Sequence, residues 1–274
     1  MMKKKVRMAI LGASGRMGLQ LIQAVHQSEA ATLVAALVRK KSPLINIDAG
    51  EFAGIGSIKV VFSDDLEVIS DAFDIMIDFT SPQATLSHLD FCCKQQKSMI
   101  IGTTGFDELG KEEIKKAAKK IGIVFSANFS IGVNLMLQLL EKTAIMIGNH
   151  SDIEIIEAHH RYKKDAPSGT ALAIGERIAK ALGNALKKET IFDLTASLNE
   201  RAFGKIHFST IRAGDIVGEH TVLFAGIGES FEMTHKATSR INFANGAVRA
   251  ALWLAKKNQN GVFDMNDVLD FNAF

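Results

Sequence analysis

This sequence of 274 residues has few cysteines, no long apolar stretch and no repeats, and each of these absences excludes a class of protein. Its only cysteines, Cys92 and Cys93, are adjacent, so they are badly placed to bridge each other or to form a metal cluster. No stretch approaches the roughly 18 unbroken apolar residues of a membrane-spanning helix. An internal repeat and a low-complexity tract are also missing. These absences argue against a disulfide scaffold, a cysteine-ligated metal cluster and an integral membrane protein.

An excess of charge of one sign is missing as well, because 32 basic residues face 30 acidic ones. With no global field to attract nucleic acid or an anionic membrane, any anion site must be local. The start, MMKKKVRMAIL, imitates a secretory signal, but Arg7 interrupts it and a glycine-rich turn follows in place of a cleavage site. We therefore expect a cytoplasmic protein that binds neither nucleic acid nor membranes.

The chain is long enough for two domains, and its first half alternates short apolar runs with helical patterns. The pattern predicts strands at 6–11, 32–38, 73–79, 99–102 and 122–126, and helices at 16–26, from residue 82 and at 107–119. Such alternation is typical of a parallel sheet covered on both faces. We predict an α/β fold with an N-terminal, Rossmann-type, doubly wound parallel sheet.

The pattern changes after about residue 130. It predicts a helix at 131–147, a strand at 152–158, a helix at 168–182 and a polar stretch, then strands at 205–212, 219–225 and 230–236, and a last helix at 243–257. Strands joined by short turns indicate antiparallel pairing. The second half is therefore expected to be an α+β domain with an open mixed, mostly antiparallel sheet.

The segment GASGRMG at 12–18 places glycines three residues apart between a predicted strand and a helix. This is the GxxGxxG form of the dinucleotide-binding fingerprint, in which backbone N–H groups approach a pyrophosphate at a helix N-terminus. The alternative is a tight strand-to-helix turn with no ligand. The position of this segment between a predicted strand and a predicted helix favours the cofactor-binding interpretation.

The choice of cofactor depends on the end of the second predicted strand. A carboxylate there would bind the adenosine ribose hydroxyls, but this strand ends in Val38, Arg39, Lys40 and Lys41. Cations suit a 2′-phosphate, so NADPH is favoured and NADH stays possible. The alternative is an exposed basic turn. Two further loops, GTTGF at 102–106 and SANF at 126–129, also follow predicted strands, where a nicotinamide could bind.

The densest titratable cluster is EAHHRYKKDAPSGTAL at 157–172. A solvated basic loop is one interpretation. The other is an anion site, because Ser168, Gly169 and Thr170 start a predicted helix whose N–H groups and dipole favour a carboxylate. The composition alone leaves both open.

Together these segments resemble the dihydrodipicolinate reductase family, also called 4-hydroxy-tetrahydrodipicolinate reductases. The resemblance spans nearly the whole chain and rests on GASGRMG at 12–18, DFTSP at 78–82, GTTGF at 102–106, ANFSIGVN at 127–134, EAHHRYKKDAPSGTAL at 157–172, RAGDIVGEH at 212–220 and FANGAVRAALWL at 243–254. It implies NAD(P)H-dependent reduction of a cyclic dicarboxylate on the route to diaminopimelate and lysine. It also implies a homotetramer, a dinucleotide-binding domain at 1–130, a substrate-binding and oligomerisation domain at 131–240, and a segment at 241–274 that returns to the first domain.

The resemblance also implies roles for single residues, and no metal. His159 would be the catalytic acid/base and Lys163 a second proton donor, with substrate contacts from His160, Gly169 and Thr170. Cofactor contacts would come from Gly12, Ala13, Ser14, Gly15, Arg16, Met17, Arg39, Gly102, Thr103, Thr104, Ser126, Ala127, Asn128 and Phe129. Members that use NADH well often carry glutamate where this chain has Val38, which counts against efficient use of NADH.

The chemistry suits these residue types. Hydride addition to a conjugated imine drives negative charge onto the far atom of the conjugated system, where a general acid must deliver a proton. Histidine is best suited to this near neutral pH. His159 and Lys163 are four residues apart, as on one helix face, but the segment leaves a strand and meets a proline. We therefore expect a loop there.

Other candidates have structural interpretations. Cys92 and Cys93 are expected in a helix, buried or half-buried. Glu154 and Glu157 could orient His159, but strand alternation favours a surface position for them. The remaining histidines of the strand region lack the spacing of metal ligands; they are His207, His220 and His235.

Two other functions stay open. A nucleotide-binding redox regulator would need no catalytic histidine and would carry a DNA-binding segment, which is not visible. A two-domain dehydrogenase for another small acid, such as an aspartate-semialdehyde or homoserine enzyme, is the nearer alternative.

Overall fold

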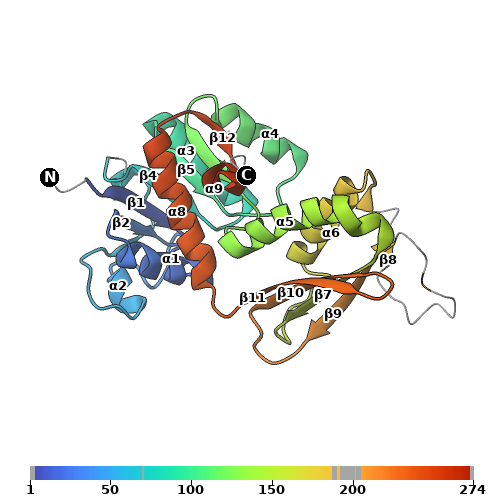
Figure 1. Cartoon of the computed structure of the whole chain (residues 1–274). Helices are drawn as coiled ribbons and strands as arrows, with labels where there is room; N and C mark the ends of the chain where they lie inside the picture. The colour runs from blue at the N-terminus through green and yellow to red at the C-terminus, as the bar shows by residue number, and fades with distance from the viewer. Residues whose placement is uncertain (1–3, 70, 187–189, 192–200, 202–204, 272–274) are drawn as a thin grey trace. The chain divides into compact units, whose positions relative to one another are not determined.

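A computed structural model describes residues 4–69, 71–186, 190–191, 201 and 205–271 (Figure 1). The chain divides into two compact units, one comprising Met1–Ile131 with Arg240–Phe274 and the other comprising Gly132–Ser239. The polar stretch predicted before the strand at 205–212 lies largely outside the described residues. The two units are described separately below.

The first unit is built on a seven-stranded sheet, with the order β12-β6-β5-β4-β1-β2-β3 and parallel pairing throughout. Its strands are β1 (Val6–Leu11), β2 (Ala31–Leu37), β3 (Phe62–Ser63), β4 (Ile75–Asp78), β5 (Ser98–Ile101), β6 (Gly122–Phe125) and β12 (Gly261–Phe263). Its α-helices are α1 (Arg16–Gln27), α2 (Ala49–Phe52), α3 (Pro82–Gln95), α4 (Glu108–Ala117), α8 (Ile241–Lys257) and α9 (Met265–Leu269). The predicted doubly wound parallel sheet is confirmed.

Alternate residues of the strands face two separate apolar layers. Met8 and Ile10 of β1 pack in the layer with α1 and α8, whereas Ala9 and Leu11 pack in the layer with α3 and α4. Figure 1 shows α1 and α8 together beside the sheet. Because both faces are covered, each strand is apolar along its length, which explains the continuous runs in the sequence.

The strand order reverses beside β1, which fixes where a ligand binds. From β1 the chain builds β2 and β3 on one side, and then crosses to build β4, β5 and β6 on the other. In open α/β sheets the crevice outside the carboxyl ends of the strands at such a switch point receives the ligand. In this unit the crevice lies beyond the ends of β1 and β4.

The second unit has a five-stranded mixed sheet in the order β11-β10-β7-β9-β8. Its strands are β7 (Asp152–His159), β8 (Thr190–Ile191), β9 (Ile206–Arg212), β10 (Gly218–Ala225) and β11 (Ser230–Ala237). β10 pairs antiparallel with β11 and β7 over eight and seven residues, and β9 pairs parallel with β7 and β8 over seven and two. The open mixed, mostly antiparallel sheet is confirmed.

Helices α5 (Ile131–Ile147) and α6 (Gly169–Ala181) pack with one face of this sheet. Residues 131–150 are long and apolar enough to cross a membrane by length and composition alone. However, Leu140 and Ala144 of α5 are fully buried in the same core as Ile155 of β7. These contacts pack one face of α5 into the core of the second unit.

Candidate active site

His159 is the last residue of β7, the central strand of the second sheet, and it is only 8% exposed. Its Nδ1 lies 2.5 Å from Oε2 of Glu157, two residues earlier on the same strand. An ionised carboxylate only accepts hydrogen bonds, so Nδ1 holds a proton in this pair. Nε2 is therefore the ring nitrogen that remains for proton exchange with a ligand.

The Glu157 carboxylate is fully buried, at 0% exposure, and both of its oxygens have several donors. Arg212, at the end of β9, donates from Nη1 to Oε2 at 2.9 Å and from Nη2 to Oε1 at 2.7 Å. Thr210 Oγ1 and the backbone N–H of Ser168 each donate to Oε1 at 3.2 Å. A buried charge is stable only with such partners, and together they hold the carboxylate against His159.

The prediction that Glu157 lies at the surface is wrong. Glu157 lies on the face of β7 that carries the buried residues Ile153 and Ile155. Glu154 lies on the opposite face, where its side chain is 14% exposed and pairs with Arg201 at 2.8 Å. Strand alternation shows which face a glutamate occupies, but not that cations from other segments cover it.

Burial and the neighbouring charges both shift the pKa values of Glu157 and His159. Burial alone would raise the pKa of Glu157, but the hydrogen bonds and charges of Arg212 and His159 outweigh it and hold that pKa below its ordinary value. The pKa of His159 is lowered, first by burial and also by the charges of Lys163 and Arg212, although Glu157 works against this shift. His159 is therefore held as a comparatively strong acid when it is protonated.

The other side of the His159 ring is kept open by Gly218, the first residue of β10. A Cβ at this position would lie 3.0 Å from His159 Nε2, so a side chain would crowd this nitrogen. His220 stands beside the ring with centroids 5.2 Å apart, and its Nε2 lies 3.1 Å from Ser168 Oγ. Burial lowers the pKa of His220 to about 4, so it is neutral near pH 7.

Lys163 lies in the predicted loop between β7 and α6. Its backbone N–H donates to the His160 carbonyl at 3.1 Å, and its Nζ donates to both carboxylate oxygens of Asp165 at 2.9 and 2.8 Å. The side chain is 21% exposed, and its charge lowers the pKa of His159. The loop thus brings the lysine within electrostatic reach of the histidine without a helix.

Two of the expected substrate contacts, Gly169 and Thr170, lie in the first turn of α6. Ser168 is its N-cap and accepts from the Ala171 N–H at 3.1 Å, while Gly169 begins the helix. A Cβ added to Gly169 would meet nothing within 4 Å, so the space over this helix end is open. The first-turn N–H group of Gly169 lacks an intrahelical acceptor. The buried Nδ1 of His160 has no hydrogen-bond partner among the described residues.

In the first unit, the glycine turn joins β1 to α1. Gly12 has a φ of +63°, which favours glycine, and it accepts a hydrogen bond from the Gly15 N–H at 2.9 Å. Gly15 is the N-cap of α1, no side chain caps it, and the first turn holds no acidic residue. The open N–H groups fit a pyrophosphate. The other predicted contacts in this turn are Ala13, Ser14, Arg16 and Met17.

The turn after β2 carries the predicted cations. Arg39, Lys40 and Lys41 are all exposed there. The backbone N–H of Lys41 donates to Asp64 Oδ2 at 3.0 Å, so one carboxylate lies at this turn after all. Asp64 could not be predicted from the end of β2, because it follows β3.

The two further cofactor loops follow β5 and β6. Thr104 is exposed, whereas Thr103 is buried, so a cofactor contact from Thr103 would come from its backbone. After β6, Ser126 Oγ donates to the Asn128 carbonyl at 2.9 Å, and Phe129 is buried with its ring 5.5 Å from that of Phe79. Gly102 and Ala127 are the other predicted contacts in these loops.

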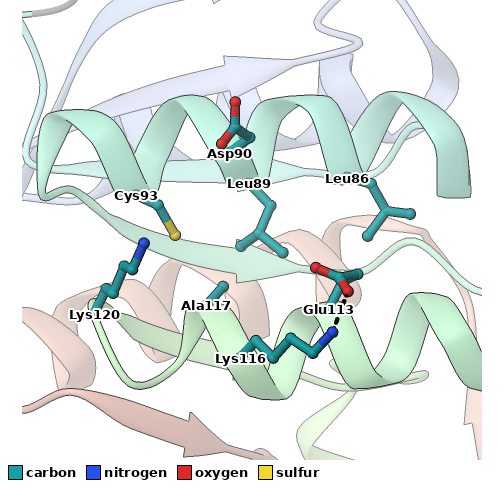
Figure 2. Close-up of a pocket in the computed structure, with 8 residues that line it drawn as sticks. All are labelled: Leu86, Leu89, Asp90, Cys93, Glu113, Lys116, Ala117 and Lys120. Carbon is teal, nitrogen blue, oxygen red and sulfur yellow. Dashed lines mark hydrogen bonds and ion pairs between the residues drawn. The ribbon is translucent and has the colours of Figure 1, made fainter.

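A cavity of about 340 Å³ lies between α3 and α4, away from all predicted site residues (Figure 2). Cys93 lines it and is half-buried, while Cys92 is fully buried in α3, as predicted. Lys116 in this cavity is paired with Glu113 at 2.7 Å. Within the described part of the chain, no group of three or more His, Cys, Asp or Glu side chains could hold a metal ion.

A doubly wound sheet with an open glycine turn, followed by a unit with a buried histidine paired to a carboxylate, is typical of a nicotinamide-dependent oxidoreductase. Comparison with known families makes this specific. The family described as dihydrodipicolinate reductase, N-terminus, matches residues 6–129, and dihydrodipicolinate reductase, C-terminus, matches residues 132–269. The chain belongs to the dihydrodipicolinate reductase family. It is an oxidoreductase with that family's role in diaminopimelate and lysine biosynthesis.

Solved structures agree with this membership. The dipicolinate-bound dihydrodipicolinate reductase from Paenisporosarcina sp. TG-14 is 25% identical, with a TM-score of 0.73 over 95% of this chain and 97% of that one. An amine dehydrogenase from Mycobacterium smegmatis is 13% identical, with a TM-score of 0.58 over 92% and 93% of the two chains. GenD2 from gentamicin A biosynthesis, in complex with NAD, is 12% identical, with a TM-score of 0.60 over 98% and 91%. The latter two show the shared fold alone.

Proposed function

We propose that this enzyme reduces 4-hydroxy-tetrahydrodipicolinate to tetrahydrodipicolinate with NADPH, and that His159 delivers the proton. The observation that carries the proposal is the His159–Glu157–Arg212 cluster, which lies in the same unit as an open helix start. The helix start would bind a carboxylate of the substrate, and the histidine would deliver the proton that accompanies hydride transfer.

The cofactor would be held by the first unit. The N–H groups at the start of α1 would bind the pyrophosphate, and the exposed Arg39 would bind a 2′-phosphate. Three cations against the single carboxylate of Asp64 favour NADPH over NADH at this turn. When bound, the reduced nicotinamide supplies the hydride. The loops after β5 and β6 would receive the nicotinamide end.

The proton would come from Nε2 of His159. Glu157 accepts from Nδ1–H, which keeps the ring oriented and stabilises the charged imidazolium before transfer. Once Nε2 has given its proton to the carbon that gained electron density, the neutral ring keeps Nδ1–H on Glu157. The lowered pKa makes the imidazolium a better donor, while a bound dianion would favour its charged form.

The substrate carboxylates would be held around the start of α6. The N–H group of Gly169, next to Thr170 in the first turn of α6, suits one carboxylate, and the unpartnered Nδ1 of His160 suits a hydrogen bond to it or to its neighbour. Lys163 would pair with the second carboxylate and assist proton delivery. The Paenisporosarcina relative was solved with dipicolinate, a dicarboxylate, which supports this class of ligand. A homotetramer stays a prediction from the family resemblance, and a cytoplasmic location stays a prediction from the sequence.

The direct test is oxidation of the reduced cofactor with enzymatically generated substrate, with NADPH and NADH measured side by side. Substrate-dependent oxidation, with a higher kcat/KM for NADPH, supports the proposal. Loss of the signal in His159→Gln would tie it to this site. If the wild-type protein oxidises neither cofactor in the presence of substrate, the proposed reaction is wrong.

A further inference from the structure

A buried polar network lies beneath the crevice of the first unit and has no part in the proposed proton transfer. Asp78 ends β4, next to β1 at the switch point, and its side chain is fully buried. Thr85 and Thr103, which are also buried at 0% and 4% exposure, belong to α3 and to the loop after β5. Burying a carboxylate costs free energy, so hydrogen-bond partners must compensate the charge of Asp78.

The hydrogen bonds show what the carboxylate holds. Asp78 Oδ1 accepts from the Thr80 backbone N–H at 2.9 Å, from Thr80 Oγ1 at 2.6 Å and from Thr103 Oγ1 at 3.4 Å. Its Oδ2 lies 2.7 Å from Nδ1 of His88, a residue of α3. One fully buried oxygen thus joins the loop after β4 to the loop after β5, while the other is held by a helix beneath them.

Thr103 is the second junction of the network. Its Oγ1 accepts from the Thr80 backbone N–H at 3.0 Å and from Thr85 Oγ1 at 2.9 Å. Because its acceptor sites are used in this way, its own hydroxyl proton points to Asp78. The hydroxyls of Thr80, Thr85 and Thr103 therefore each donate within this network, which ties the two loops to each other.

The place of these loops indicates which part of a dinucleotide they meet. The turn after β1 suits the pyrophosphate, and the cations after β2 suit the adenosine side, so the other half of the dinucleotide falls beyond β4, β5 and β6. The side chain of Thr80 also reaches the pyrophosphate turn, since a Cβ on Gly12 would lie 3.0 Å from Thr80 Cγ2. Thr80 and Thr104 are exposed at this edge, directly connected to the buried network.

We propose that Asp78, supported by His88 and joined to Thr103, is a positioning residue that holds the loops after β4 and β5 in the shape that receives the nicotinamide half of the cofactor. The inference rests on the nicotinamide cofactor of the proposed function, but not on the identity of the substrate. Asp78 then supports binding of the nicotinamide half of the dinucleotide and has no role in binding the adenosine half.

The experiment compares two ligands by calorimetry with the purified full chain: NADPH, and adenosine 2′,5′-bisphosphate, which has only the adenosine half. Asp78→Asn and Thr103→Val remove the network's charge and its second junction. Each should weaken NADPH about tenfold and leave the bisphosphate within about twofold of wild type. Thr103→Ser, which keeps the hydroxyl, should restore the NADPH affinity that Thr103→Val loses.

Cys92→Ala is the matched structural control, because Cys92 is equally buried in α3 and its Sγ contacts Met76 Sδ at 3.5 Å. It should lower the melting temperature without changing either affinity. The proposal is overturned if Asp78→Asn and Thr103→Val bind NADPH normally, or if they lose both ligands equally in step with stability. It is also overturned if wild type does not bind NADPH. A wild type that binds NADPH but does not reduce the substrate contradicts the proposed function alone.

Discussion

Replacing Glu157 with glutamine tests whether this carboxylate supports the acid form of His159. The substitution keeps the shape of the side chain but removes the negative charge that faces Nδ1 at 2.5 Å. A hydrogen bond to a charged group is worth roughly 1.5–3 kcal/mol, and one pKa unit corresponds to about 1.4 kcal/mol. The imidazolium should therefore lose about 1.5–3 kcal/mol of stabilisation, which lowers the pKa of His159 further below its ordinary value.

The kinetic consequence follows directly. At a fixed pH above the pKa of His159, the imidazolium fraction falls about ten- to a hundredfold, and kcat should fall by the same factor. The loss should shrink as the pH is lowered toward the new pKa. The assay is kcat as a function of pH, together with an NMR titration of the His159 ring.

The stability of the variant should also change with pH. The pKa of Glu157 is lowered on folding, so its contribution is fully present above its ordinary pKa of about 4.5 and is lost as the pH falls through the lower folded-state value. Leaving Arg212 without its partner should cost about 3 kcal/mol near neutral pH, at the low end for a buried pair because Arg212 is 18% exposed. Wild type and variant should converge in strongly acidic solution.

Glu154→Gln is the matched control, since it removes a glutamate from the same strand that pairs with Arg201 and not with His159. It should leave kcat and the pKa of His159 unchanged. The reasoning is refuted if Glu157→Gln keeps both the wild-type kcat and the wild-type pKa of His159.

Three further predictions concern other parts of the molecule. Arg39→Ala should weaken NADPH by about ten- to a hundredfold and NADH much less, and equal losses in a binding titration would contradict the role of this cation. Gly218→Ala would place a methyl group 3.0 Å from His159 Nε2 and should lower kcat more than it changes NADPH affinity; normal turnover would show that this nitrogen is not used. Light scattering at micromolar concentration should show a tetramer, because Leu223 and the 47%-exposed Ile211 lie on the sheet face opposite α5 and α6; a monomer would disprove it.

The long elements of both units could be predicted from the sequence, because each has an apolar pattern that only one structure satisfies. The strand Val6–Leu11 and the helix Ile131–Ile147 match their predicted ranges. Short elements such as Ala49–Phe52 and Phe62–Ser63 were not predicted, since two to four residues are too few to show a period. Their positions depend on tertiary contacts.

Residues of the candidate site could be predicted only where they lie together in one sequence motif. The segment at 157–172 contains His159, Lys163 and the start of α6 in one stretch. Arg212 and Gly218 reach His159 from β9 and β10, more than fifty residues away along the chain, and only the strand register brings them there. The resemblance segment RAGDIVGEH, at 212–220, was the one signal that could have pointed to them.

The most direct test of the account is kcat for His159→Gln with saturating NADPH and substrate, beside the same measurement for His160→Gln. We predict that His159→Gln lowers kcat about a hundredfold or more while NADPH affinity is unchanged, and that His160→Gln mainly raises KM. A near-normal kcat for His159→Gln would contradict the account, because the cluster would then bind substrate while the acid lies elsewhere.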